Sequence, residues 1–256
     1  MIQTMTLSLQ GRAARLLAGL EGGLNRIMTL WLILAMSACS MRVGLASMGT
    51  GHTGVGTAFP YILVVIAPLL SISFAMRWFA DTDRMTSKQS RFELAGKWRE
   101  VSLGEAKAHP LYGPGGFMVS LLIGILLNVP VRLAEYLVAI PAIPAEVPAW
   151  LSTLHLMMTA DVVVMTSLYT VAFVAALKRA PIFPALLMCV WAIDLSMQML
   201  IAEMVTAEGL PAKVAVPLHD LLEGNVKKAL ISVGLWLPYL ILSRRVNVTY
   251  RRRVAA

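Results

Sequence analysis

The chain has 256 residues, of which 58% are apolar and only 14% charged, and its mean hydropathy is +0.72. This composition excludes an ordinary water-soluble domain and makes lipid the expected solvent. The net charge of +8 does not indicate a nucleic-acid binder, because the basic residues flank apolar runs instead of forming one face or stripe. We therefore expect an integral membrane protein that contacts the lipid bilayer and no nucleic acid.

Six apolar runs approach the roughly 20 residues that a spanning helix needs. In chain order they cover residues 27–47, 58–76, 116–140, 157–177, 182–204 and 226–242. The third run can break at Pro130 into a span followed by an interfacial helix. The segment 7–20 is either a basic helix on the membrane surface or a solvated start. The predicted fold class is all-α, a polytopic helical membrane protein with about six transmembrane helices.

The first run has a rival interpretation as a lipoprotein signal. Arg12, Arg15 and Arg26 precede a short apolar region that ends at Cys39. Such a leader would be long, and apolar sequence resumes directly after Arg42. We therefore favour a retained span over a cleaved one.

The distribution of basic residues predicts the orientation. Seventeen of the 22 Lys and Arg residues fall in four alternate segments, namely the start before residue 27, the loop 77–114, the turn 178–180 and the tail after residue 243. The positive-inside rule then places both termini in the cytoplasm and requires an even number of spans. The basic residues assigned to the opposite side are Arg42, Arg132, Lys213, Lys227 and Lys228.

The loop 77–114 is the longest polar segment, and it divides the chain. It has too few apolar positions for a core of its own, so we interpret it as a connector or docking surface, with a short surface helix over 87–105. A cluster of Pro and Gly residues from Pro110 to Gly116 marks the entry to the third span. We expect residues 1–108 to hold two spans and this loop, and residues 109–256 to form a four-span unit with a basic tail.

The four-span unit resembles a known family. Leu111, Gly113, Gly115, Gly116 and Phe117 open it, and the closing motif is Trp236, Pro238, Tyr239, Ser243, Arg244, Arg245, Val246, Thr249 and Tyr250. Over roughly residues 109–253 these motifs are similar to the bacterial inner-membrane family known as domain of unknown function 2569. Phe117 and Tyr250 stand where that family's pattern has Trp and Phe. The resemblance implies a bacterial cell inner membrane, multi-pass location and no particular activity.

The closing motif also has a physical interpretation. Pro238 removes a backbone donor from the last span, while the polar tips of Trp236 and Tyr239 need partners or an interface. Arg244 and Arg245 then end the span at the headgroups. We favour a structural kink and anchor over a hinge that moves during transport.

Two carboxylates inside the spans are the strongest candidates for chemistry, because an ionised group in hydrocarbon costs at least about 2.5 to 3.5 kcal/mol on insertion scales. Asp194 lies near the middle of the fifth span, with Gln198 one turn further along. Asp161 lies near the outer end of the fourth span. The two acids can share one polar layer, either as a proton or cation relay or as hydrogen-bonded packing.

No motif indicates a catalytic residue, a metal site or a cofactor. The sixteen methionines lack a tight repeated spacing, so we interpret them as packing residues. We therefore favour a non-enzymatic assembly or regulatory protein that contacts another membrane protein or a second copy of itself. The alternatives are a small proton- or ion-coupled transporter that uses Asp194 and a membrane enzyme that acts on a lipid.

Overall fold

The computed structural model describes residues 2–50, 55–84, 98–144 and 147–255. Six helices in this part of the chain are long and apolar enough to cross a membrane, so the prediction of an all-α polytopic protein is confirmed. These helices are α1 (Ile2–Thr50), α2 (Val55–Trp78), α4 (Met118–Ala139), α5 (Ala149–Leu177), α6 (Phe183–Ala207) and α7 (Ala212–Leu242).

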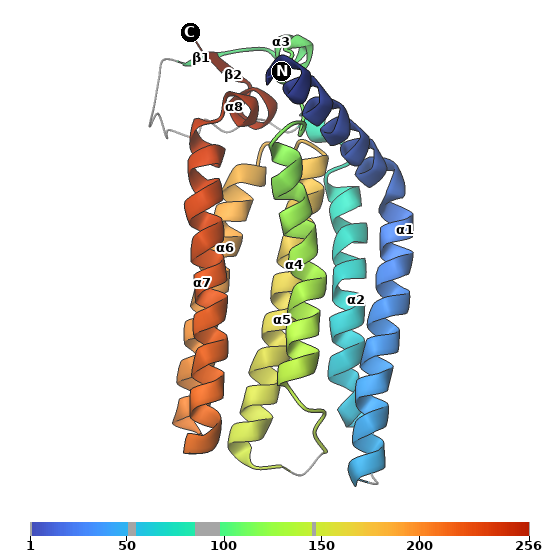
Figure 1. Cartoon of the computed structure of the whole chain (residues 1–256), viewed down its shortest axis with the longest axis vertical. Coiled ribbons are helices and arrows are strands. Elements are labelled where there is room, and N and C mark those ends of the chain that lie inside the picture. Colours follow the sequence, from blue (N-terminus) through green and yellow to red (C-terminus); the bar gives the residue numbers. More distant parts are fainter. Residues whose placement is uncertain (1, 51–54, 85–97, 145–146, 256) are drawn as a thin grey trace.

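The long helices run side by side along the longest axis of the molecule (Figure 1). Helix α5 is the central one: its most apolar stretch is 67% buried, compared with 11% in both α1 and α7. Phe173, Val174 and Ala175 are all fully buried although they point in successive directions around the helix. A helix that is apolar on every side fits the core of a bundle, and here α5 packs against α2, α4 and α6.

Helix α1 is continuous from Ile2 to Thr50, so the N-terminal segment is helical. Its first part lies obliquely across one end of the bundle, and the rest runs alongside α2 (Figure 1). The apolar span within α1 begins at Leu24, directly after Gly22 and Gly23. A glycine pair is a common site of helix bending, and it offers a physical reason for the change in direction.

The break that the sequence allows at Pro130 does not occur, because α4 continues through this residue to Ala139. Helix α2 likewise contains Pro60 and Pro68, and α7 contains Pro217 and Pro238. Membrane-spanning helices tolerate proline where neighbouring helices and local adjustments satisfy the freed carbonyls. Helix α4 has this support, since it packs against α5 and α1.

A small folded cap covers the end of the bundle where the described chain starts and finishes (Figure 1). Strand β1 (Trp98–Glu100) pairs antiparallel with β2 (Arg253–Ala255). Helix α3 (Leu103–Ala108) follows β1, and its start has a capping box in which Ser102 and Glu105 satisfy each other's backbone N–H groups. A 3-10 turn, η1 (Thr82–Arg84), lies beyond α2.

The helix predicted over 87–105 is therefore wrong over residues 98–102 and right only for its last three residues. Residues 98–100 form a strand, because they pair with the C-terminal tail, and helix begins only at Leu103. Residues 87–97 of that prediction lie outside the described residues.

The basic tail folds back onto the bundle instead of extending from it. Helix α8 (Arg244–Arg251) buries Val246, Val248 and Tyr250. The Tyr250 hydroxyl donates a 2.9 Å hydrogen bond to the Ala176 carbonyl of α5. Burial raises the pKa of Tyr250 well above its ordinary value, so the phenol stays protonated and remains a donor.

Candidate functional site

An ion network in the interior of the four-span unit joins three helices. The guanidinium of Arg132, on α4, contacts Asp161 of α5 through Nη1 at 2.6 Å and Asp194 of α6 through Nη2 at 2.7 Å. The Arg132 side chain is 11% exposed, that of Asp161 is 3% exposed and that of Asp194 is 4% exposed. One arginine thus bridges the two carboxylates that the sequence singled out.

Neutral side chains complete the inner part of the network. Tyr169 of α5 donates its hydroxyl to Asp194 at 2.8 Å. Gln198 of α6 donates to Asp161 at 3.3 Å and accepts from the Asn225 amide of α7 at 3.2 Å. The network therefore ties α4, α5, α6 and α7 together by side-chain contacts.

The outer part of the network is more exposed. Lys228 of α7 lies 3.3 Å from Asn225 Oδ1 and forms an ion pair with Glu135 of α4. The Lys228 side chain is 57% exposed and that of Glu135 is 32% exposed. The network thus continues from fully buried acids to a charged pair at the bundle surface.

The depth of these groups makes them unusual. At about 1.5 Å of rise per residue, Arg132, Asp161 and Asp194 lie about 17 to 24 Å along their helices from the capped end of the bundle. The hydrocarbon core of a bilayer is about 30 Å thick. All three charges therefore fall within the membrane, where ionisable residues are rare and usually face a protein interior or a water-filled cavity.

A cavity of about 40 Å³ adjoins the network. Its polar lining comes from α4, α5, α6 and α7: Asn128, Arg132, Glu135, Tyr169, Asp194, Asn225, Lys228 and Ser232. A water needs roughly 10 to 15 Å³ of such space and two to four polar partners, so the cavity has room for a few waters. Glu135 and Asp194 both line it, so the cavity lies between the exposed acid and the buried one.

The charges of the network do not balance when every group is ionised. Three carboxyl groups, on Glu135, Asp161 and Asp194, face two cationic groups, on Arg132 and Lys228. One bound proton makes this set neutral. In a medium of low dielectric constant an uncompensated charge is costly, and the fully ionised set has one more carboxylate than it has cations.

Helical periodicity explains how these residues meet. On α4, Asn128, Arg132 and Glu135 are spaced by four and three residues and share one face. On α7, Asn225, Lys228 and Ser232 have the corresponding spacing of three and four. Both faces line the same cavity, so a polar stripe runs between α4 and α7.

The structure brings Asp161, Asp194 and Gln198 together in one polar layer, and the feature that the sequence did not indicate is the arginine that bridges the two acids. Gln198 bonds to Asp161, not to Asp194. Assigning Arg132 to the outer side was wrong, since it lies inside α4 and holds both acids. Lys227 and Lys228 lie within α7, which begins well before them at Ala212. The sequence feature that could have placed Arg132 inside the bundle was the helical spacing of Asn128, Arg132 and Glu135 within an apolar run.

The two motifs that carry the family resemblance contact each other at the capped end. Phe117 packs on Trp236 and Tyr239, with ring centroids 5.0 and 5.4 Å apart. Arg245 donates to the Gly113 carbonyl at 3.2 Å, and its guanidinium lies over Gly115 and Gly116. Pro238 lies within α7, and Ser243 joins α7 to α8 as the cap of both helices.

A second buried polar cluster lies nearer the other end of α4 and α5. The Tyr136 hydroxyl is 2.8 Å from Thr159 Oγ1 and 3.5 Å from His155 Nε2. Thr159 also donates to the carbonyl of His155 at 2.7 Å. Thr166 and Thr170 make the same hydrogen bond to the carbonyl four residues back, which satisfies their hydroxyls within α5.

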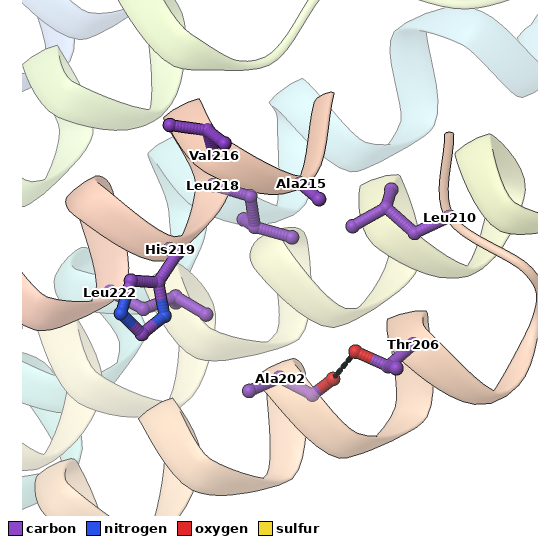
Figure 2. Close-up of a pocket in the computed structure, with 8 residues that line it drawn as sticks. All are labelled: Ala202, Thr206, Leu210, Ala215, Val216, Leu218, His219 and Leu222. Atoms are coloured by element: carbon purple, nitrogen blue, oxygen red, sulfur yellow. Dashed lines mark hydrogen bonds between the residues drawn. The ribbon is translucent and has the colours of Figure 1, made fainter. Parts of the chain in front are cut away.

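The pocket in Figure 2 lies between the end of α6 and the start of α7, and it contains none of the network residues. Its volume is about 370 Å³, and its lining is mostly aliphatic. The Thr206 hydroxyl is engaged by the Ala202 carbonyl at 2.6 Å, as the dashed line shows. His219 is left as the main polar group, which gives little basis for specific recognition.

Within the described part of the chain, no cluster of three or more His, Cys, Asp or Glu residues is placed to hold a metal ion. Cys39 and Cys189 are free thiols.

Comparisons with protein-family models, with curated proteins and with solved structures each found no match to this chain.

Proposed function

We propose that this chain is a proton-coupled membrane protein, in which the network around Arg132 binds a proton and transmits the change in charge to α7. The observation that carries the proposal is the arginine bridge between Asp161 and Asp194, buried at membrane depth and bordered by a cavity with room for water. A small proton-coupled transporter is the class of protein that needs such a site.

The path of the proton follows from the lining of the cavity. A proton that arrives at Glu135, the more exposed acid, passes through cavity water to Asp194. Once Asp194 is protonated, its attraction to Arg132 weakens while Asp161 keeps its charge. The side-chain amides of Gln198 and Asn225 take no part in the proton transfer in this scheme. They position Asp161 and join α7 to the site.

The test is a proton-flux assay with purified protein in liposomes that contain a pH-sensitive dye. An imposed pH gradient should dissipate faster with the wild type than with empty liposomes. The Asp194→Asn and Asp161→Asn variants should reduce this flux to the level of empty liposomes. Glu203→Gln is the matched control, because it removes a carboxylate from an exposed position of the same helix. A flux that Asp194→Asn leaves unchanged would contradict the proposal.

Assembly with a partner remains a second candidate, and one specific observation favours it. Lys228 is 57% exposed, although it lies within an apolar helix that is long enough to span a membrane. Contact between an ammonium group and lipid hydrocarbon is energetically costly, so either water or a polar side chain of another membrane protein covers the Lys228 ammonium group. A partner helix, or a second copy of this chain, seated along Glu135 and Lys228 would supply that cover.

Affinity purification from native membranes in a mild detergent separates the two candidates. An assembly role predicts one stoichiometric membrane partner that the wild type and Asp194→Asn both retain but Lys228→Ala loses. Lys227→Ala is the control, since Lys227 pairs with Glu223 on its own helix. Flux without a retained partner supports the transporter.

The location in a bacterial cell inner membrane, with both termini in the cytoplasm, is part of the same proposal. The concentration of basic residues on the capped end supports the orientation. Membership in the family of domain of unknown function 2569 is proposed as well, on the contact between the motif around Gly115 and the motif around Trp236.

A further inference from the structure

A second site lies at the capped end, far along the helices from the ion network. Its cavity has a volume of about 480 Å³. The loop from Pro110 to Gly116 forms most of the lining, with Leu17 of α1, Arg179 of the turn between α5 and α6, and Arg245 of α8. Two arginines from separate parts of the chain therefore line one cavity.

The two guanidinium groups converge on the same glycine turn. Arg245 Nη1 donates to the Gly113 carbonyl at 3.2 Å. A Cβ built on Gly113 would lie 3.9 Å from Arg179 Nε, and one built on Gly115 only 3.2 Å from Arg245 Nη1. Gly113 and Gly116 have φ values of +96° and +61°, which only glycine adopts without strain. The loop thus needs glycine both for its shape and to admit the arginines.

Both arginines keep donors that no described carboxylate satisfies well. Arg179 Nε is buried and has no hydrogen-bond partner among the described residues. Arg179 Nη2 contacts Glu21 at 3.4 Å, but that carboxylate is 43% exposed, so solvent screens the pair. The Arg179 guanidinium also lies over the ring of Tyr112, 5.8 Å from its centroid. Among the described residues, no buried carboxylate balances this concentration of positive charge.

The position of the cavity indicates the kind of anion. Its residues lie directly beyond the ends of three spans, since α4 begins at Met118, α5 ends at Leu177 and α7 ends at Leu242. Lipid headgroups occupy this level of a membrane protein. The N-terminal end of α4 lies on the same side, and the helix dipole gives it a partial positive charge.

An aromatic surface continues from the cavity along the span. Phe117 follows the glycine turn and is 57% exposed. It packs on Trp236 and Tyr239 of α7. Aromatic residues with polar tips are typical of the membrane interface, where they lie against the glycerol region and the upper acyl chains. The cavity and this surface together match a charged headgroup joined to an apolar tail.

We propose that the pocket formed by the 110–116 turn, Arg179 and Arg245 binds the phosphate group of an anionic membrane lipid. Arginine recognises phosphate through paired N–H donors, and the two arginines supply the donors from different elements. A bound phosphate would join the end of α5, the start of α4 and helix α8.

The test uses the full-length protein in a non-ionic detergent, with lipid binding measured by native mass spectrometry. Phosphatidylglycerol should bind the wild type about tenfold more tightly than phosphatidylcholine, because only the former carries net negative charge. Arg179→Gln together with Arg245→Gln should lower phosphatidylglycerol binding by about tenfold or more, as expected for the loss of charge-assisted hydrogen bonds.

The matched control is Lys178→Gln with Arg244→Gln. These residues directly precede the two arginines, and the change removes the same charge without touching the pocket. This control should bind phosphatidylglycerol as the wild type does. Equal loss of binding in both double variants would overturn the assignment of the lipid to this pocket, since it would show that only the total charge of the protein matters.

Two measurements on the wild type keep the proposal falsifiable even if the double variant fails to fold. Equal affinity for phosphatidylglycerol and phosphatidylcholine would overturn it. Inorganic phosphate added alone distinguishes the source of the ligand. If it displaces phosphatidylglycerol at millimolar concentration, the pocket binds a free phosphate and the lipid assignment is wrong. We expect no displacement. None of these results depends on proton flux.

Discussion

Arg132 is the residue on which the interior of the four-span unit depends most. Its removal leaves Asp161 and Asp194 without their shared counter-ion in a buried site. We expect Arg132→Met to lower the free energy of unfolding by about 3 to 5 kcal/mol, the usual cost of breaking a buried ion pair. Denaturant unfolding in mixed micelles measures the change.

The neutral triple variant Arg132→Met, Asp161→Asn and Asp194→Asn is the control for that prediction. It removes every charge of the bridge, so it should recover much of the stability that Arg132→Met loses. A triple variant at least as unstable as the single one would show that the loss came from packing around the arginine and not from unpaired carboxylates.

Asp83 offers a prediction at the membrane surface, outside the spans. The hydrogen bond from Lys107 at 2.7 Å, and then its positive charge, lower the pKa of Asp83 below its ordinary value of 3.8. Because the pKa of Asp83 is lower in the folded protein than in the unfolded chain, the contact stabilises the fold at any pH above the unfolded-state pKa. This stabilisation is lost as the pH falls through the folded-state pKa. The η1 turn should therefore separate from α3 only below about pH 4.

A carbon-detected NMR titration of labelled aspartate measures this effect. Lys107→Met should return the pKa of Asp83 toward 3.8, whereas Lys107→Arg should keep it low. An unchanged titration in Lys107→Met would refute the contact. Neither side chain is buried, so the effect on global stability should be small.

At the scale of elements, helix α8 is fixed to the bundle by a few specific contacts. Tyr250→Phe removes the hydrogen bond to the Ala176 carbonyl and should cost about 1 kcal/mol. Ala176 keeps the backbone N–H of Arg179 as a partner, so its carbonyl is not left unsatisfied. The expected loss is therefore modest, and thermal unfolding in detergent measures it. A cost near that of a large core deletion, about 3 to 5 kcal/mol, would mean that the ring itself is displaced.

The long elements are predictable from sequence because their signal is local. A run of about 20 apolar residues identifies a span without any knowledge of its neighbours, and each of the six expected runs falls within one of the six long helices, to within two residues at either end. The cap was not predictable in this way. Strand β1 has only three residues and exists because β2 pairs with it from 155 positions later in the chain, as in the pair Arg99 and Val254.

The candidate site was half predictable for a similar reason. Asp161 and Asp194 stand out as acids in apolar runs, and the antiparallel arrangement of adjacent spans brings them to one level. The position of Arg132 depends on which face of α4 meets α5, which hydropathy does not reveal. Arg132, which lies near Pro130 in an apolar run, was therefore assigned to the outer side of the membrane. Its neighbours Asn128 and Glu135 nevertheless continue the same polar face of α4.

The orientation is a property of the whole molecule, and it makes a prediction about labelling. In a chain whose Cys39 and Cys189 are replaced by alanine, single Ala108→Cys and Ala212→Cys variants mark opposite ends of the bundle. A membrane-impermeant maleimide should label Ala212→Cys on intact cells, and Ala108→Cys only after the membrane is opened. The reverse pattern would place the basic cap outside.

The central claim concerns the whole network, which has three carboxyl groups for two cations and is proposed to hold an exchangeable proton. Infrared difference spectroscopy of the protein in lipid, between neutral and alkaline pH, observes such a proton as a protonated carboxyl band. We predict that the band appears in the wild type, disappears in Asp194→Asn and persists in Glu203→Gln. A wild-type spectrum without it, or a band that Asp194→Asn leaves intact, would contradict proton binding at this site.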